Sequence, residues 1–221
     1  MDKDEASEEA LLDARQKWDE RYRWFNARQI EPNPDPWLRR WPSVLKAAGD
    51  GPVLDLGCGS GLDSEALTRQ GIRAVSVDFA REALRATRQR LPAGRFVLAD
   101  LRQGLPFAAE SCQLIVANLV LHYYRWAATL EIVADIRRCL KPGGQLLARV
   151  NGVGDDNFGA KGNPQVEAGL FLVEGVLKRF FDRDGIESLF GRGWRLQAVQ
   201  QQTTVRYQRQ KRLWEFVAEK I

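Results

Sequence analysis

The 221-residue chain lacks features that define several large classes of protein. No apolar run approaches the roughly 20 residues of a membrane-spanning helix, so we expect no membrane partner. The first residues, MDKDEASEEALLD, are acidic and contain no apolar core, which argues against a signal peptide. The three cysteines, Cys58, Cys112 and Cys139, have no CxxC spacing, and one would be left over after any pairing. We therefore expect reduced thiols, a cytoplasmic location and no metal site.

The chain also lacks a large excess of either positive or negative charge. The chain has 33 basic and 29 acidic residues, a net charge of +4, and its Lys and Arg residues form no dense block. A nucleic-acid partner is therefore not expected. The composition, 44% hydrophobic and 28% charged, is that of an ordinary globular protein. A chain of this length can bury about 70% of its unfolded surface in one domain.

Prolines set off an N-terminal segment. Residues 5–28 show a helical pattern of apolar side chains. The stretch that follows, IEPNPDPWLRRWP, has prolines at positions 32, 34, 36 and 42, which forbid a long helix. We interpret residues 1–45 as an N-terminal helical cap with a stiff connector, and residues 46–221 as the main domain.

The main domain alternates short apolar strands with helices, a pattern typical of a parallel sheet covered on both faces. The KPGG stretch at 141–144 predicts a turn. The predicted strands are 53–56, 74–77, 96–99, 114–117 and 145–150, and the predicted helices are 60–69, 81–91 and 129–140.

The C-terminal third is less regular. Residues 151–163 are rich in Gly, Asn and Asp and predict a mobile loop, and 166–181 predict a short hairpin or an extended cover. Residues 182–190 form a further predicted helix with Asp182 as its cap. The last strands, 194–199 and 213–219, are joined by residues without a helical pattern, which favours an antiparallel pair.

The stretch VLDLGCGSGLD after the first predicted strand carries glycines at positions 57, 59 and 61. A glycine turn between a strand and a helix lets the backbone approach a ligand closely. The dinucleotide spacing G-x-G-x-x-G is not met, because position 62 is Leu. Asp55 lies two residues before the first glycine. Its carboxylate would repel a pyrophosphate and attract an ammonium group, so the loop favours a nucleoside that carries a cation.

Two more acids end predicted strands. Asp78 follows the glycines by about 20 residues, where a carboxylate can accept hydrogen bonds from both ribose hydroxyls. Asp100 ends the third strand, where a carboxylate can accept a bond from an adenine amine. Each acid alone could instead be a helix cap, but the three together with the glycine turn favour a nucleoside site.

The motifs VLDLGCGSG, SVDFA, VLADL, LIVANLVLHYY and LKPGGQLLARVN have the order and spacing of class I S-adenosylmethionine-dependent methyltransferases, and the chain resembles this family over roughly residues 50–151. KWDERY and the segment from KRFF to WEFVA more narrowly resemble bacterial methyltransferases of the tellurite-resistance and thiopurine type. The resemblance implies a Rossmann-like three-layer α/β/α sandwich, in which a seven-stranded sheet is parallel except for an inserted antiparallel last strand.

The resemblance also implies a cofactor site for S-adenosyl-L-methionine, which leaves as S-adenosyl-L-homocysteine. Asp55 and the glycine loop would face the methionine part, Asp78 the ribose, and Asn118 the methionine end. The remaining implied cofactor residues are Gly57, Cys58, Gly59 and Gly61 in the loop and Phe79, Asp100 and Leu101 around the adenine.

Substrate residues are less sharply indicated. His122 is the only histidine and lies four residues past Asn118, so it is a candidate base or substrate orienter, or else a packed loop histidine. Tyr123 could form a substrate wall or belong to the core. Trp18 and Tyr22 on the N-terminal helix, with Trp37 in the connector, could close over the pocket or simply bury an apolar stripe.

Polar residues after the fifth strand give further substrate candidates. Asn151 and Lys161 lie on the Gly-rich loop and could contact the substrate or be solvated. Arg149 and Arg179 could bind an anionic substrate or form ion pairs.

We expect a methyltransferase that acts on a small-molecule acceptor through O, N, S or a metalloid. RNA or protein methylation is an alternative, although the Asn-Pro-Pro-Tyr type of signature for base amines is absent: the fourth strand ends in ANLVLHYY. A non-catalytic S-adenosylmethionine-binding regulatory module is the other alternative. The intact set of acids and glycines argues against such a module.

Overall fold

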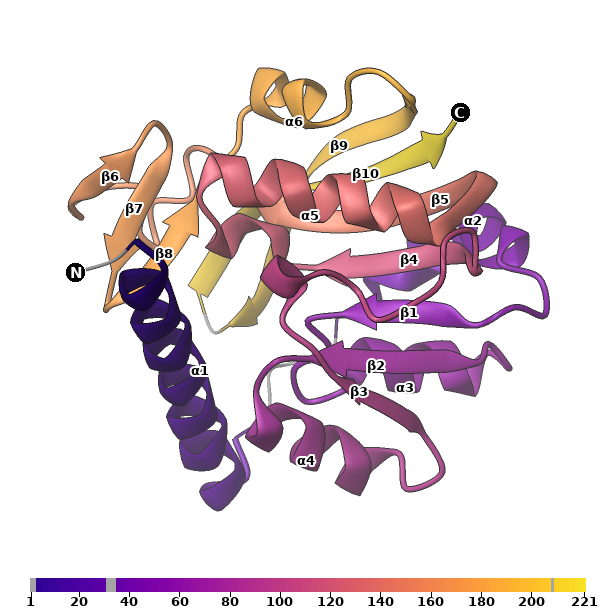
Figure 1. Cartoon of the computed structure of the whole chain (residues 1–221), viewed down its shortest axis with the longest axis horizontal. Helices are drawn as coiled ribbons and strands as arrows, with labels where there is room; N and C mark the ends of the chain where they lie inside the picture. Colours follow the sequence, from indigo (N-terminus) through magenta and orange to yellow (C-terminus); the bar gives the residue numbers. More distant parts are fainter. Residues whose placement is uncertain (1–2, 31–34, 208) are drawn as a thin grey trace.

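The computed structural model describes residues 3–30, 35–207 and 209–221. Its centre is a seven-stranded sheet in the order β3-β2-β1-β4-β5-β10-β9 (Figure 1). Only β10 runs antiparallel to its neighbours β5 and β9, which confirms the predicted topology with the last strand inserted. The strands are β1 (Val53–Leu56), β2 (Ala74–Asp78), β3 (Arg95–Leu98), β4 (Cys112–Asn118), β5 (Leu140–Asn151), β9 (Trp194–Tyr207) and β10 (Arg209–Lys220).

Helices cover both faces of this sheet and bury two apolar clusters, as the uninterrupted apolar strands predict. One cluster packs α5 (Trp126–Cys139) and α6 (Arg183–Leu189) against residues such as Leu54 and Ile115. The other packs η1 (Trp37–Arg40), α2 (Pro42–Ala47) and α3 (Leu62–Arg69) against the opposite face of the same strands. Between β2 and β3 the chain forms α4 (Arg81–Arg90). The protein therefore has the expected three-layer α/β/α architecture.

Two predicted loops are parts of strands. The KPGG stretch lies inside β5: Cys112 pairs with Leu140 and Leu114 with Gln145, so residues 141–144 fit as an irregularity opposite Gln113. The predicted turn forms there, because Gly143 has a φ of 71° and a Cβ on Gly144 would lie 2.8 Å from the carbonyl oxygen of Lys141. After the turn, β5 continues in the same direction beside β4. The polar residues between 199 and 213 extend β9 and β10 into one long hairpin, in which Thr204 pairs with Lys211.

The segment between β5 and β9 forms the predicted cover. A small sheet consists of β6 (Gln165–Glu167), β7 (Leu170–Val173) and β8 (Val176–Arg179), all antiparallel. Asp182 caps α6 as predicted, because its Oδ1 accepts a hydrogen bond of 2.8 Å from Gly185 N.

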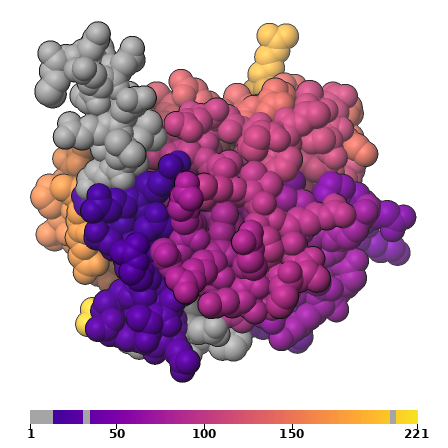
Figure 2. Space-filling view, turned by 60° about the horizontal axis from the view of Figure 1, so that its bottom comes forward, coloured from indigo at the N-terminus to yellow at the C-terminus, as the bar shows by residue number. Residues whose placement is uncertain are grey.

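The N-terminal helix α1 (Lys3–Ala27) lies across the carboxyl-terminal edge of the sheet (Figure 1). Asp19 accepts a hydrogen bond from the backbone N of Glu82 on α4, and Lys17 Nζ donates to the carbonyl of Gly175 between β7 and β8. Figure 2 shows α1 in indigo between the orange β6–β8 region and the magenta α4 region. In the described ranges no helix has the length and apolar character that crossing a membrane requires.

Candidate functional site

A cavity of about 1440 Å³ lies where the strand order reverses beside β1, at the carboxyl ends of the parallel strands. Ligands of open α/β sheets bind at this place. The loops after β1, β2, β3 and β4 form one wall, and α1 with the β7–β8 turn forms the other. The donor end, as we name it, is lined by residues 57–60, Leu62, Asp63, Asp78, Phe79, Ala99, Leu101, Arg102 and 118–120. The acceptor end is lined by Lys17, Trp18, Arg21, His122, Tyr123, Arg125, Phe158, Leu172, Gly175, 176–178 and Lys211.

The glycine loop is shaped for close approach. Gly57 and Gly59 have φ values of 64° and 57°, which side chains rarely adopt. A Cβ at Gly57 would lie 2.5 Å from Val120 Cγ2, and one at Gly59 would lie 2.5 Å from the hydroxyl of Tyr22. Cys58 lines the cavity as a neutral thiol, because burial and the nearby charge of Asp78 raise its pKa well above the usual value.

Asp78 lies at the end of β2, with its carboxylate held by the loop it faces. Its Oδ2 accepts a hydrogen bond of 3.0 Å from Gly59 N, and its Oδ1 accepts one of 2.9 Å from Ala80 N. Burial raises the pKa of Asp78 to about 6, although these two bonds favour the ionised form. A carboxylate has about four acceptor positions, so Asp78 can still accept a hydrogen bond from a ligand hydroxyl.

Asp55 does not line the cavity. It is 1% exposed, and Ser64 Oγ donates to its Oδ2 at 2.6 Å. Burial, and then the charge of Asp63, raise the pKa of Asp55 to far above the usual range of a carboxyl group. The Asp55 carboxylate therefore does not contact a ligand ammonium group in the cavity directly, because its side chain points toward Ser64 of α3.

Asp63 takes the position at the cavity that we expected for Asp55. Its two carboxylate oxygens accept hydrogen bonds from Trp37 Nε1 at 2.9 Å and from Asn118 Nδ2 at 2.5 Å. This bond fixes the Asn118 amide, whose Oδ1 is buried and has no hydrogen-bond partner in the described part of the chain. An acceptor oxygen beside a carboxylate fits the ammonium group of a methionine moiety. Nothing in the sequence distinguished Asp63 from a helix N-terminal acid.

Phe79 and Leu101 both line the donor end, which places apolar surface on two sides of a space for a planar base. Asp100 is not among the lining residues. Its carboxylate is bound by the Arg102 guanidinium, with Nε–Oδ1 at 3.0 Å and Nη2–Oδ2 at 2.7 Å, and it also accepts from Arg102 N. The sequence predicts that Asp100 accepts a hydrogen bond from an adenine amine. It would have to do so with a carboxylate that already accepts three hydrogen bonds.

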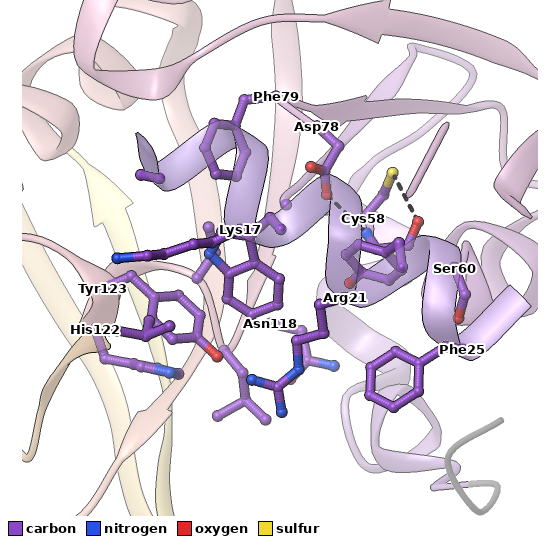
Figure 3. A pocket seen from close by; sticks show the side chains of 18 of the residues that line it. Lys17, Arg21, Phe25, Cys58, Ser60, Asp78, Phe79, Asn118, His122 and Tyr123 are labelled. Atoms are coloured by element: carbon purple, nitrogen blue, oxygen red, sulfur yellow. Dashed lines mark hydrogen bonds between the residues drawn. The ribbon is translucent and has the colours of Figure 1, made fainter. Parts of the chain in front are cut away.

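In Figure 3, His122 and Tyr123 lie on one side of the cavity, and Asp78 and Cys58 lie on the other. His122 belongs to η3 (Leu121–Tyr123) and is 1% exposed, and its Nδ1 has no hydrogen-bond partner among the described residues. Burial, and then the charges of Lys211 and Lys178, hold the pKa of His122 well below its usual value. The imidazole is therefore neutral at physiological pH.

Helix α1 lines the cavity, as the lid interpretation of the N-terminal segment predicts. The Trp18 and Tyr22 rings stack at 5.9 Å, and Trp18 meets Tyr123 edge to face at 5.1 Å. The Arg21 guanidinium lies 5.4 Å from the Trp18 ring centre. These contacts join α1 to the loop after β4 over the middle of the cavity.

Trp37 does not line the cavity, so of the two roles considered for it the structure shows the packing role. Its side chain is fully buried in the apolar cluster under η1, and the Arg149 guanidinium lies 5.1 Å from its ring centre. Arg149 is also buried and pairs with Asp35 at 2.7 Å and with Glu215 at 3.2 Å. Asp35 and Trp37 of the connector therefore contact Arg149 of β5, which also pairs with Glu215 of β10.

The other substrate candidates also lie away from the cavity. Arg179 is 5% exposed and is bound by the carboxylate of Glu167 and the carbonyl of Ala168. Lys161 is exposed and pairs with Asp156 at 3.0 Å. Asn151 is fully buried outside the lining, with both amide atoms unpartnered in the described part of the chain. None of the three lines the cavity. Of the alternatives considered, the structure shows ion pairing for Arg179 on β8 and an exposed position for Lys161, while Asn151 ends β5.

The residues that sequence reasoning missed are Lys178 on β8, Lys211 on β10 and Phe158 in the loop after β5. All three line the acceptor end. Lys211 is 6% exposed, lies 3.4 Å from the Asp155 carboxylate and sits 4.5 Å from the Phe158 ring centre. No local motif marks them, because they meet only after the small sheet and the long hairpin have formed.

Comparisons with known proteins agree with this geometry. Residues 53–144 match a family model described as a methyltransferase domain. The trans-aconitate 2-methyltransferase of Paracidovorax citrulli is 35% identical over 128 residues, which are 57% of this chain and 46% of that protein. The chain thus spans about half the length of the curated relatives it matches.

Solved structures share the fold. A SAM-dependent methyltransferase from Methanosarcina mazei gives a TM-score of 0.70 at 19% identity, covering 82% of this chain and 98% of that one. The 1,6-didemethyltoxoflavin-N1-methyltransferase of Burkholderia thailandensis, bound to 1,6-didemethyltoxoflavin and S-adenosylhomocysteine, gives 0.67 at 21% identity, covering 96% and 89%. None of these three proteins is of the tellurite-resistance or thiopurine type, so that narrower resemblance stays a prediction.

The sheet order, the glycine loop at its switch point and the matched segment agree with one another. The chain has the fold of solved S-adenosylmethionine-dependent methyltransferases, and its residues 53–144 match a methyltransferase domain.

Proposed function

We propose that the protein transfers a methyl group from S-adenosylmethionine to a small-molecule acceptor. The observation that carries this proposal is a single cavity that joins the glycine loop to a second, chemically different end beside His122. Its volume of about 1440 Å³ exceeds the roughly 300–1,000 Å³ of a typical ligand pocket, so it has space for a donor and an acceptor together.

The donor end supplies a partner for each part of the cofactor. Asp78 accepts the ribose hydroxyls, Phe79 and Leu101 flank the adenine, and Asp63 with Asn118 receives the methionine ammonium. The loop glycines let the backbone approach the methionine part closely. When bound, the cofactor supplies an electrophilic methyl group on a sulfonium.

The protein positions the acceptor and limits the space around it. Holding the acceptor in line with the S–CH3 bond can lower the barrier by roughly 7–11 kcal/mol through proximity and orientation. Helix α1 and the β7–β8 turn line the cavity on the side opposite the sheet, so they limit the space around the methyl group. A space bounded on two sides favours a small acceptor over RNA or protein. Two similar proteins are named for small-molecule acceptors, trans-aconitate and 1,6-didemethyltoxoflavin.

The test is release of S-adenosylhomocysteine by the purified chain. The acceptor panel contains thiols, phenols, amines, carboxylic acids including trans-aconitate, selenite, tellurite, RNA and protein extract. We expect turnover with at least one small-molecule class, and loss of turnover in Asp78→Asn at cofactor concentrations that saturate the wild-type protein. Turnover confined to RNA or protein would overturn the small-molecule assignment. Tight cofactor binding without turnover on the whole panel would establish a binding module instead.

A further inference from the structure

An arginine lines the donor end of the cavity where the sequence predicts an acid. Arg102 is among the lining residues beside Leu101, whereas Asp100 is not. Asp100 caps the short helix η2 (Leu101–Gln103), because its Oδ1 accepts a hydrogen bond of 3.0 Å from Arg102 N. The same turn brings the Arg102 side chain back to the carboxylate that caps it. Two residues close in the sequence thus form one unit at the place proposed for the adenine.

The Asp100 carboxylate is largely occupied within this unit. The Arg102 guanidinium donates from Nε to Oδ1 at 3.0 Å and from Nη2 to Oδ2 at 2.7 Å. A two-point pair between a guanidinium and a carboxylate is among the strongest and most directional hydrogen-bonded contacts in proteins. The Asp100 side chain is 4% exposed and the Arg102 side chain is 25% exposed. The accessible part of the pair is therefore the guanidinium.

A guanidinium recognises different atoms of a base than a carboxylate does. A carboxylate can accept a hydrogen bond from the adenine amine, whereas a guanidinium only donates. Two of its five N–H groups go to Asp100, so three remain for a ligand. Tyr124 lines the same cavity, and burial, followed by the charge of Asp100, raises the pKa of its hydroxyl, which therefore keeps its proton and can also donate. The acceptors that adenine offers near its amine are the ring nitrogens N1 and N7.

We propose, resting on the proposed function, that Arg102 recognises the base of the cofactor by donating a hydrogen bond to N1 or N7, and that Asp100 does not bind the adenine amine. Asp100 is then a positioning residue, because it holds the guanidinium in place. Phe79 and Leu101 provide the apolar surface for the ring. The donor end therefore selects a purine ring and does not require its amine.

The first test uses the wild-type protein alone. Calorimetric titration compares S-adenosylhomocysteine with its purine analogue, in which hydrogen replaces the amine and both ring nitrogens are kept. We expect the two dissociation constants to agree within about fivefold. If the Asp100 carboxylate bound the amine, loss of that hydrogen bond would weaken the analogue about 10- to 150-fold. A loss greater than about fivefold would overturn the proposal.

The second test concerns the guanidinium. The 1-deaza and 7-deaza analogues of S-adenosylhomocysteine each have carbon in place of one ring nitrogen. One of them should bind the wild-type protein about 10- to 150-fold more weakly than S-adenosylhomocysteine, and this loss should disappear in Arg102→Leu. Asp100→Asn, which keeps the shape of the side chain, should weaken S-adenosylhomocysteine and its purine analogue by the same factor. Unimpaired binding of both deaza analogues to the wild-type protein, or a loss in Asp100→Asn confined to the ligand with the amine, would overturn the proposal.

The controls separate the possible failures. Arg183→Leu is the matched variant, because Arg183 is exposed on α6 and its guanidinium pairs with the Glu187 carboxylate at 2.7 Å. It should bind all four ligands as the wild-type protein does. The wild-type comparisons decide the question even if Arg102→Leu does not fold. No binding of S-adenosylhomocysteine to the wild-type protein would overturn the proposed function, whereas binding that requires the amine would overturn only the role of Arg102.

Discussion

Replacing Asp78 by Asn tests the donor end most directly. Asp78→Ala would be a poor probe, because it leaves the buried N–H groups of Gly59 and Ala80 without acceptors, at about 1–3 kcal/mol each. Asn keeps the shape and one acceptor oxygen, so only one of the two N–H groups loses its acceptor, and that group then faces the amide NH2. It removes the charge and one of the two oxygens that a ribose diol would use. The variant therefore disturbs the loop less than Ala does, and its folding is measured as a control.

The expected magnitude follows from the bonds that remain. One hydrogen bond to a charged acceptor is worth about 1.5–3 kcal/mol, so Kd for S-adenosylmethionine should rise roughly 10- to 150-fold. S-adenosylhomocysteine shares the ribose and should lose the same factor. A loss confined to S-adenosylmethionine would instead implicate the sulfonium end.

The pH dependence gives a second measure of the same group. Burial raises the pKa of Asp78 to about 6, and ribose hydroxyls bind the ionised form better. Wild-type affinity should therefore fall by up to about tenfold per pH unit below pH 6, and Asp78→Asn should not show this fall. For the cofactor-free protein the sign is opposite. The folded pKa of about 6 exceeds the usual 3.8, so ionisation of Asp78 destabilises the fold as pH rises from about 4 to 6.

Isothermal titration calorimetry across this pH range provides the assay, with thermal unfolding of the cofactor-free variant as the control for folding. A Kd within about twofold of wild type, in a variant that unfolds normally, would refute the placement of the ribose at Asp78. Equal pH dependence in both proteins would assign the titration to another group.

Two further predictions concern other parts of the chain. Glu215→Ala leaves buried Arg149 with Asp35 as its carboxylate partner, and should lower the free energy of unfolding in urea by about 3–5 kcal/mol. A loss below about 1 kcal/mol would contradict this. Tyr22→Ala should raise the cofactor Kd about tenfold, as expected for about 1.4 kcal/mol of lost aromatic contact. Glu20→Ala, on the exposed side of α1, is the control and should leave this Kd unchanged. Equal effects of the two variants would mean that α1 acts only through folding.

The sequence predicts most of the central fold because each element carries its own local signal. Apolar runs of about four residues mark β1, β2 and β4, and each predicted helix from α3 to α5 begins within three residues of its predicted start. The main failure has a physical cause. The residues between 199 and 213 are polar because the long hairpin extends beyond the apolar core, and a solvated strand has the composition of a loop. The KPGG turn forms as predicted, but the sequence does not show that it is an insertion within β5.

The donor end was predictable to the extent that it depends on backbone geometry. A turn with positive φ at Gly57, Gly59 and Gly61 favours glycine at these positions, so the glycine spacing in the sequence predicts the backbone shape of this turn. Asp78 follows because the next parallel strand ends at the same edge. Asp55 shows the limit of this reasoning. Its position in the motif is correct, but the direction of its side chain depends on Ser64 from α3, which no local pattern reveals.

The acceptor end depends on packing between distant segments, so the sequence could not show it. Lys178 and Lys211 belong to different sheets, and each alone is indistinguishable from a solvated surface lysine. Arg149 and Arg179 looked better placed for an anion because they end apolar strands, yet carboxylates of the same chain already neutralise them. The spacing of the glycines thus predicts the donor end, whereas the acceptor end depends on which side chains the cover and the long hairpin bring to the cavity.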